Sequence, residues 1–248
     1  MIRGLYTSGL GMTRETKRLD IISNNLANAS TTGFKTDGTV QGTFKQKLDD
    51  IMVSGSRIDV ANYTPDIVRS YTNYTQGSLH STGNSTDVAI SGDDYAFFTV
   101  EDNEGNQLYT RDGGFTIDKD RFLVTTEGYR VLSENGYINL ADSNFAIGFD
   151  GSITNSNGES LGKLKITSFE NPETLTKLGN NLLSADMDSI VKDFEGEVNQ
   201  NYLEMSNVNT VNEMVNMIAI SRAYEANQKV LQTQDEMLGR AVSDVGRV

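Results

Sequence analysis

The 248-residue sequence contains no cysteine, no tryptophan, one histidine and two prolines. Without cysteine there is no disulfide, no thiolate metal site and no cysteine nucleophile. A lone imidazole, His80, cannot build a common zinc site. No stretch approaches the ~20 consecutive apolar residues that a membrane-spanning helix requires. The sequence therefore predicts neither a metal or other cofactor nor membrane insertion.

Two further absences concern export and nucleic acid. The N-terminus has no apolar signal core followed by a cleavage site, so we expect any export to bypass the classical signal-peptide route. The formal net charge is −13, and the acidic excess lies in the middle of the chain. An acidic surface repels phosphate, so nucleic acid is not an expected partner.

The first segment carries an apolar stripe with a period of seven residues. Spacings of seven place the same side of a helix inward at each repeat, as in the seam of a coiled coil. Ile22 lies three residues to one side of this stripe. The repeating positions are Leu5, Met12, Leu19 and Leu26.

The last segment repeats the pattern. Residues 208–245 contain one glycine and no proline, so a single helix of about 55 Å is predicted at 1.5 Å per residue. Its stripe has the same period of seven and includes Met217, Tyr224, Leu231 and Leu238.

Each stripe alone is typical of an ordinary surface helix on its own domain. Two stripes of one period at opposite ends of the chain favour pairing of the termini, within one molecule or between neighbouring molecules. We predict that the nine stripe residues named above, Ile22 included, form an assembly interface.

Between the helices, short alternating apolar runs are separated by hairpin-type turns such as Asp112-Gly113-Gly114 and Glu134-Asn135-Gly136. This pattern predicts a compact antiparallel β domain. The fold class is therefore α+β, with N- and C-terminal helices pairing as a coiled coil and a central antiparallel all-β domain inserted between them. The predicted segments are 1–35 (helix and turn), 36–76 (extended connector), 77–200 (β domain) and 201–248 (helix).

Two short helical stretches are predicted between the terminal helices. In the connector, the spacing of apolar residues is compatible with a short helix around residues 44–52. Later, Asn171-Pro172 indicates a turn into a short helical stretch that ends near Asn180.

Several motifs resemble the signatures of bacterial flagellar rod and hook axial proteins. The resemblance rests on Ser23-Asn24-Asn25-Leu26-Ala27-Asn28-Ala29-Ser30-Thr31-Thr32-Gly33-Phe34-Lys35 near the N-terminus and on Asn201-Tyr202-Leu203-Glu204-Met205-Ser206-Asn207 near the C-terminus. In the middle, Gly77-Ser78-Leu79 and Tyr109-Thr110-Arg111-Asp112-Gly113 match the longer rod proteins. The matches span nearly the whole chain in the right order, which makes a chance match very improbable.

The first of these motifs contains a predicted signature turn, because its polar residues are poor helix formers and good turn formers. Capping of the helix and contact between subunits both remain open as roles for its asparagines. The residues assigned to the signature turn are Asn24, Asn25, Asn28, Gly33 and Phe34.

The resemblance implies a structural, non-enzymatic subunit of the flagellar basal body. The chain is long enough for one middle domain, and in this it is most similar to the distal-rod type. A proximal-rod or hook-type protein is the alternative. Implied partners are further copies of the chain, other rod and hook proteins and the flagellar export apparatus, with a final location outside the cytoplasm.

The sequence also bears on two other classes of function. A secreted wall-associated enzyme would need a matched acid, base or nucleophile, and no Gly-x-Ser-x-Gly elbow or phosphate-binding loop is present. A calcium-stabilised adhesin would use the alternating oxygens of Asp102, Glu104 and Asn106, but this run lacks the expected terminal glutamate. A hairpin turn is the favoured interpretation there.

Overall fold

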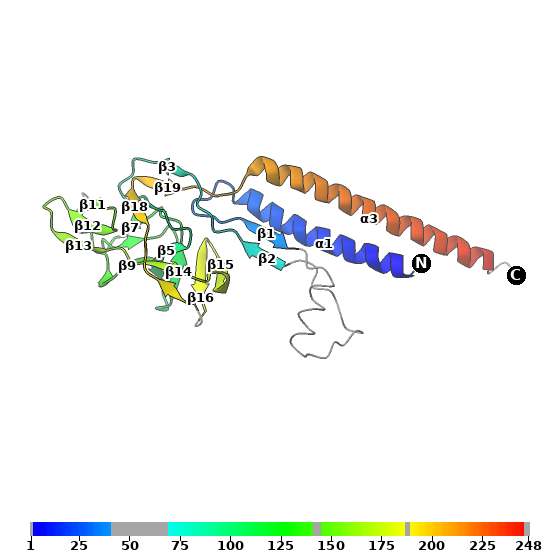
Figure 1. The fold of residues 1–248 in the computed structure, drawn as a ribbon, viewed down its shortest axis with the longest axis horizontal. Coiled ribbons are helices and arrows are strands. Elements are labelled where there is room, and N and C mark those ends of the chain that lie inside the picture. The colour runs from blue at the N-terminus through cyan, green and yellow to red at the C-terminus, as the bar shows by residue number, and fades with distance from the viewer. Residues whose placement is uncertain (1, 41–68, 141–144, 187–188, 246–248) are drawn as a thin grey trace. The chain divides into compact units, whose positions relative to one another are not determined.

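The computed structural model describes residues 2–40, 69–140, 145–186 and 189–245 (Figure 1). The chain divides into two compact units. The helical unit comprises Met1–Ala27, Asp37–Tyr71 and Asn209–Val248, and the β unit comprises Asn28–Thr36 and Thr72–Val208. The predicted helix around residues 44–52 lies outside the described residues.

The helical unit is built from α1 (Ile2–Ala27) and α3 (Thr210–Val245). The two helices pack along each other, with both chain termini at one end, so they are antiparallel (Figure 1). The Asn209 side chain caps α3 by accepting a hydrogen bond from the Asn212 amide at 3.1 Å. Neither described helix is apolar over a span long enough to cross a bilayer.

Two short strands complete the described part of the helical unit. β1 (Asp37–Val40) pairs with β2 (Arg69–Thr72), so the ends of the predicted connector form a two-stranded ribbon. The buried amide of Asn25 on α1 pairs with the backbone of Asp37 in both directions, at 2.8 and 3.0 Å. This side chain fixes the start of β1 against α1.

The β unit has antiparallel pairing throughout its described strands, as predicted. The largest sheet has the order β15-β16-β6-β5-β9-β8-β7, with β14 on β5, β17 on β14 and β10 on β9. A three-stranded sheet has the order β11-β12-β13. The strands are β3 (Leu79–Ser81), β4 (Val88–Ser91), β5 (Ala96–Glu101), β6 (Gln107–Thr110), β7 (Thr116–Ile117), β8 (Leu123–Val124), β9 (Arg130–Ser133), β10 (Gly136–Tyr137), β11 (Phe145–Ile147), β12 (Ser152–Asn155), β13 (Ser160–Lys163), β14 (Ile166–Phe169), β15 (Leu175–Gly179), β16 (Leu182–Ala185), β17 (Val191–Lys192), β18 (Glu197–Gln200) and β19 (Tyr202–Glu204).

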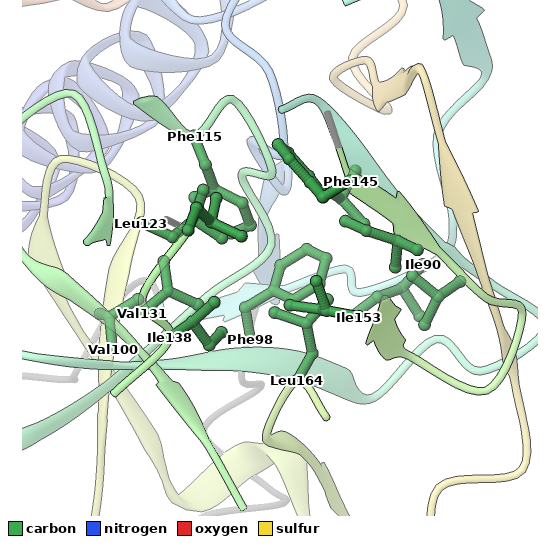
Figure 2. Close-up of a cluster of buried hydrophobic side chains, with 14 of the residues drawn as sticks. Ile90, Phe98, Val100, Phe115, Leu123, Val131, Ile138, Phe145, Ile153 and Leu164 are labelled. Carbon is green, nitrogen blue, oxygen red and sulfur yellow. The ribbon is translucent and has the colours of Figure 1, made fainter. Parts of the chain in front are cut away.

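Strand β5 is buried on both of its faces. Side chains alternate across a strand, so Phe98 and Val100 point into the larger core, shown in Figure 2, while Phe97 points into a smaller aromatic core with Tyr74 and Phe169. The smaller core is built from edge-to-face ring contacts, such as Tyr74 with Phe97 at 5.8 Å between centroids. β5 is therefore the central strand of the β unit.

The first and last strands of the β unit pair with each other. β3 pairs with β19, and β4 pairs with β18. The segment that enters the β unit therefore lies beside the segment that leaves it, as expected for a domain inserted between two helices.

Some elements differ from the sequence prediction. The prediction of a helical stretch ending near Asn180 is wrong. Only Pro172–Thr174 forms a 3₁₀ turn, and β15 follows at once. Pairing with β16 and burial of Leu175 outweigh the local helix signal there. Residues 202–204, which were assigned to the C-terminal helix segment, form β19.

Candidate functional site

The predicted stripe of α1 lies along the packed seam with α3, but its residues flank the most buried positions. Ser8, Glu15 and Ile22, each three residues after one of the first three stripe positions, are buried, as is Asn25, which binds Asp37. Of the predicted residues, Leu5 is exposed and Met12, Leu19 and Leu26 are half-buried. On α3 the same pattern holds, because Ile220 is buried while Met217, Tyr224, Leu231 and Leu238 are half-buried.

The helices are in close contact at a glycine of α1. A Cβ at Gly11 would lie 3.0 Å from Nδ2 of Asn227 on α3, whereas a Cβ at Gly9 would meet nothing within 4 Å. Gly11 thus allows a contact that a larger residue would obstruct.

We expect Gly11→Leu to weaken the α1–α3 pair by about 1–3 kcal/mol, because the added side chain must displace Asn227 or separate the helices. Amide hydrogen exchange on α1 and α3 measures the effect. Gly9→Leu is the matched control, since it adds the same side chain to the same helix where space is open. Equal protection in the two variants would contradict close packing at Gly11.

A second apolar face of α3 lies outside the seam. Four residues of its first two turns follow the i, i+3, i+4, i+7 pattern of a single helix face. Their side chains are exposed to between 46 and 62%. They are Val211, Met214, Val215 and Ile218, and we call them the outer face of α3.

The part of the predicted signature turn that follows α1, Asn28–Thr36, belongs to the β unit and is held there by several hydrogen bonds. The name signature turn is used for these residues from here on. The Gly33 amide donates to the Glu204 carbonyl at 2.8 Å, and the Thr32 hydroxyl donates to Asp112 at 2.7 Å. Asn181 donates to the Thr32 carbonyl at 2.7 Å. Phe34 is buried beneath the Lys177 ammonium, which lies 4.9 Å from the ring centroid.

Gly33 is required at this position for two reasons. Its φ is +68°, a left-handed conformation that disfavours residues with a Cβ. A Cβ here would also lie 2.5 Å from the Asp112 amide nitrogen. The glycine of the motif therefore permits the chain to lie directly on the loop that follows β6.

Three charged side chains meet beneath the signature turn, and we call them the ion cluster. Glu204 on β19 accepts from Lys35 Nζ through Oε1 and from Arg111 Nε through Oε2, each at 2.6 Å. All three residues are at most 5% exposed. The Glu204 Oε1 atom also accepts the Gly77 amide at 2.8 Å.

Arg111 uses its remaining donors on the backbone. Its Nη1 donates to the carbonyl of Asp93 at 2.9 Å and to that of Ala96, and its Nη2 donates to Ile90 at 3.3 Å. The planar guanidinium thus satisfies carbonyls of β4 and of the turn into β5 in addition to Glu204. Each charged group of the ion cluster is thus hydrogen-bonded, as a buried charge requires.

Burial and charge have opposite effects on the pKa of Glu204. Burial alone raises the pKa of this carboxyl, but the charges of Arg111 and Lys35 and their hydrogen bonds outweigh burial and hold the pKa below its ordinary value. Burial lowers the pKa of the Lys35 ammonium; the Glu204 charge opposes this decrease, and the Arg111 charge adds to it.

The lowered pKa of Glu204 predicts an acid-sensitive contribution to stability. A carboxyl whose pKa is lower in the folded than in the unfolded state stabilises the fold above the unfolded value, here 4.5, and this stabilisation is lost as pH falls through the folded pKa. We therefore expect Glu204→Gln to flatten the decline in the free energy of unfolding below pH 4.5. Urea titrations at several pH values measure the slope, with Glu134→Gln at the exposed Lys163 pair as the control. An unchanged slope in Glu204→Gln would contradict this prediction.

A second asparagine clamp lies next to the ion cluster. Asn207 accepts the Thr36 amide at 2.9 Å and donates to the carbonyls of Asn73 and Thr75 at 2.9 and 3.0 Å. This amide bridges the end of the signature turn to the start of the second segment of the β unit.

The predicted signature residues have separate roles. Asn25 clamps β1, Asn28 accepts the Thr31 amide through its carbonyl at 3.1 Å, and Gly33 and Phe34 dock into the β unit. Asn24 is exposed on α1. Lys35, Arg111, Glu204 and Asn207 all lie within the motifs that carry the family resemblance, but local sequence patterns do not connect them. Opposite charges in separate motifs are the signal that could have connected them, because a lysine, arginine or glutamate is seldom fully buried unless it is paired.

The minor candidates have structural explanations. His80 is exposed on β3. The Asp102 carboxylate accepts the amides of Glu104 and Asn106 at 2.8 and 2.9 Å, so the run between β5 and β6 is a hairpin turn as favoured. Among the described residues, no group of three potential metal ligands gathers.

Comparison with known families matches the chain in three places. Residues 5–35 match the flagella basal body rod protein family, residues 89–155 the flagellar hook protein FlgE/F/G D1 domain, and residues 199–244 the flagellar basal body rod FlgEFG protein C-terminal family. The two terminal matches contain Gly33 and Lys35 of the signature turn and Glu204.

Individual relatives are similar over almost their whole length. The flagellar basal-body rod protein FlgG of Borreliella burgdorferi is 34% identical, covering 97% of this chain and 98% of the relative. FlgG of Bacillus subtilis is also 34% identical, over 98 and 99%. FlgF of Caulobacter vibrioides is 33% identical, over 94 and 93%. The chain belongs to the flagellar basal-body rod protein family, as its motifs predicted.

Proposed function

We propose that this chain is a structural subunit of the flagellar rod, of the distal type, and that it polymerises through its terminal helices into the shaft between motor and hook. The family membership supports the rod assignment, because relatives that match over nearly the whole chain are named basal-body rod proteins. Their identities exceed 30% at almost complete coverage, so the shared fold extends through both helices and the β unit. A proximal-rod or hook-type role is the nearest alternative.

The observation that carries the polymerisation proposal is the outer face of α3. Its four apolar side chains follow one helix face but make no part of the buried seam with α1. Exposed apolar side chains gathered on one face mark interaction surfaces. A second copy of the chain is the proposed occupant of this face. Each copy also carries stripe residues on α1 and α3 that repeat every seven positions and are only half-buried in the single chain.

The seam residues contribute differently in this proposal. The half-buried stripe positions, including Leu19 and Leu231, have apolar surface left over after α1 and α3 have paired. Packing against helices of neighbouring copies would bury this remainder. The predicted assembly interface is thus proposed to consist of these stripe residues together with the outer face of α3.

The other rod and hook proteins are proposed as neighbours at the ends of the polymer. Export by the flagellum's own secretion apparatus, with the N-terminal segment as its address, is proposed on the same family grounds. A wall-associated enzyme gains no support from the described residues, since Glu204 is neutralised by its own buried cations and Asp102 is used to close a turn.

Complementation tests the proposal. In a strain from which this gene has been deleted, we expect no hook on the purified basal bodies and no swimming, and the wild-type chain should restore both. Electron microscopy of the basal bodies then places the chain, carrying a tag in the Asn103 turn, on the rod. Basal bodies with complete rods in the deletion strain would contradict the proposed function.

A further inference from the structure

The ion cluster joins three parts of the chain that are distant in sequence. Lys35 comes from the signature turn, Arg111 from the end of β6 and Glu204 from β19. One carboxylate therefore serves two buried cations. The Glu204 carbonyl also accepts the Gly33 amide, so the same residue holds the signature turn through its backbone and its side chain.

The charges make each part dependent on the others. Without the Glu204 carboxylate, docking of the signature turn would place the Lys35 ammonium near the Arg111 guanidinium in a buried site, with neither cation paired to a carboxylate. Removing one partner of a buried pair leaves an uncompensated charge, which is strongly destabilising. Without the signature turn, Glu204 would lose its Lys35 partner and β19 would lose the bond from Gly33.

We propose that Glu204 forms a reciprocal interlock, in which the signature turn (Asn28–Thr36) and strand β19 each stay docked in the β unit only while the other is docked. Lys35 follows α1 in the chain and Glu204 precedes α3, so the interlock fastens or releases both connections to the helices together. The interlock operates within a single copy of the chain and does not depend on polymerisation. Reciprocity is a thermodynamic requirement for any such coupling.

Hydrogen exchange on the full-length protein tests the first direction. Glu204→Gln keeps the size of the side chain and removes its charge. We expect the amides of Gly33 and Phe34 to exchange at least about tenfold faster, since undocking no longer separates an ion pair. The amide of Thr99 on β5 should keep its protection. Glu134→Gln, which affects an exposed pair at 3.2 Å, is the control.

The second direction uses a change in the signature turn. Gly33→Ala strains a φ of +68° and places a Cβ 2.5 Å from the Asp112 amide, so it should undock the turn. The interlock then predicts faster exchange, by a similar factor, of the Met205 amide, which bonds to Ser78 beside β19. Gly128→Ala is the matched control, with a φ of +92° but no atom within 4 Å of the added Cβ.

The results separate an interlock from simpler arrangements. Loss of protection at the signature turn in Glu204→Gln and at Met205 in Gly33→Ala, with β5 unchanged in both, supports it. Unchanged protection in either variant overturns it. Simultaneous loss of protection at Thr99 also overturns it, because Glu204 would then stabilise the whole core and not a separable latch.

Discussion

Arg111→Met is expected to lower the free energy of unfolding by about 3–5 kcal/mol, among the largest effects of any single substitution in this chain. The change removes a 2.6 Å ion pair with Glu204 and leaves the carbonyls of Asp93 and Ala96 without their donor. An unpaired buried acceptor retains its full desolvation cost. Urea unfolding, followed by circular dichroism because the chain has no tryptophan, measures the loss.

Arg111→Lys separates charge from geometry. Lysine keeps the positive charge but cannot reach Glu204 and two backbone carbonyls at once, so an intermediate loss is expected. Lys163→Met is the matched control, because it removes a cation of the β unit whose partner is exposed. A loss below about 1 kcal/mol in Arg111→Met would contradict the structural importance of the ion cluster.

Ile218→Asp is expected to abolish incorporation into the rod, and with it swimming, while leaving the monomer folded. Ile218 is 56% exposed on the outer face of α3, so an aspartate there remains hydrated in the single chain. Burial of that aspartate against an apolar neighbour would leave an unpaired charge, which costs several kcal/mol at each of many repeated contacts. Motility agar and purification of basal bodies measure the effect.

The control for this variant lies on the same helix. Asn216→Asp introduces the same charge at an exposed position two residues before Ile218, which is about 200° round the helix and therefore off the outer face. It should swim. Melting temperatures of both monomers should stay within a few degrees of the wild type, since surface substitutions usually change stability by less than ~0.5 kcal/mol. Normal swimming by Ile218→Asp would contradict the proposed role of the outer face.

Periodicity predicted the helices well because their apolar positions repeat over many turns. The stripes of Leu5 and Met217 identified both helices and their pairing, but not which flanking positions would be most buried. Ser8 and Glu15 lie in the seam although neither is apolar. Gly11 lies between them and contacts Asn227 of α3. Such close contact is a property of the pair of helices and cannot be predicted from one of them alone.

The site was predicted as separate pieces. The motifs that contain Lys35, Arg111 and Glu204 were each noted for their resemblance, but the 2.6 Å contacts between them depend on long-range pairing of β3 with β19. Sequence separation hides such contacts from local patterns. The misassigned stretch before Asn180 has the same origin, because pairing of β15 with β16 overrides the local preference. The four predicted segments remain a prediction.

The most direct test of the central claim measures burial of the outer face of α3 in assembled rods. Because the chain has no cysteine, Ile218→Cys provides a single thiol for maleimide labelling, and Asn103→Cys in the exposed β5–β6 turn provides a reference. Each thiol is compared in the monomer, in purified rods and in rods dissociated by denaturant. Assembly through the helices predicts that the thiol at position 218 reacts in the monomer and in dissociated rods but at least about tenfold more slowly in intact rods. Equal reaction rates at position 218 in monomer and intact rods would show that the outer face stays open to solvent and would contradict the account.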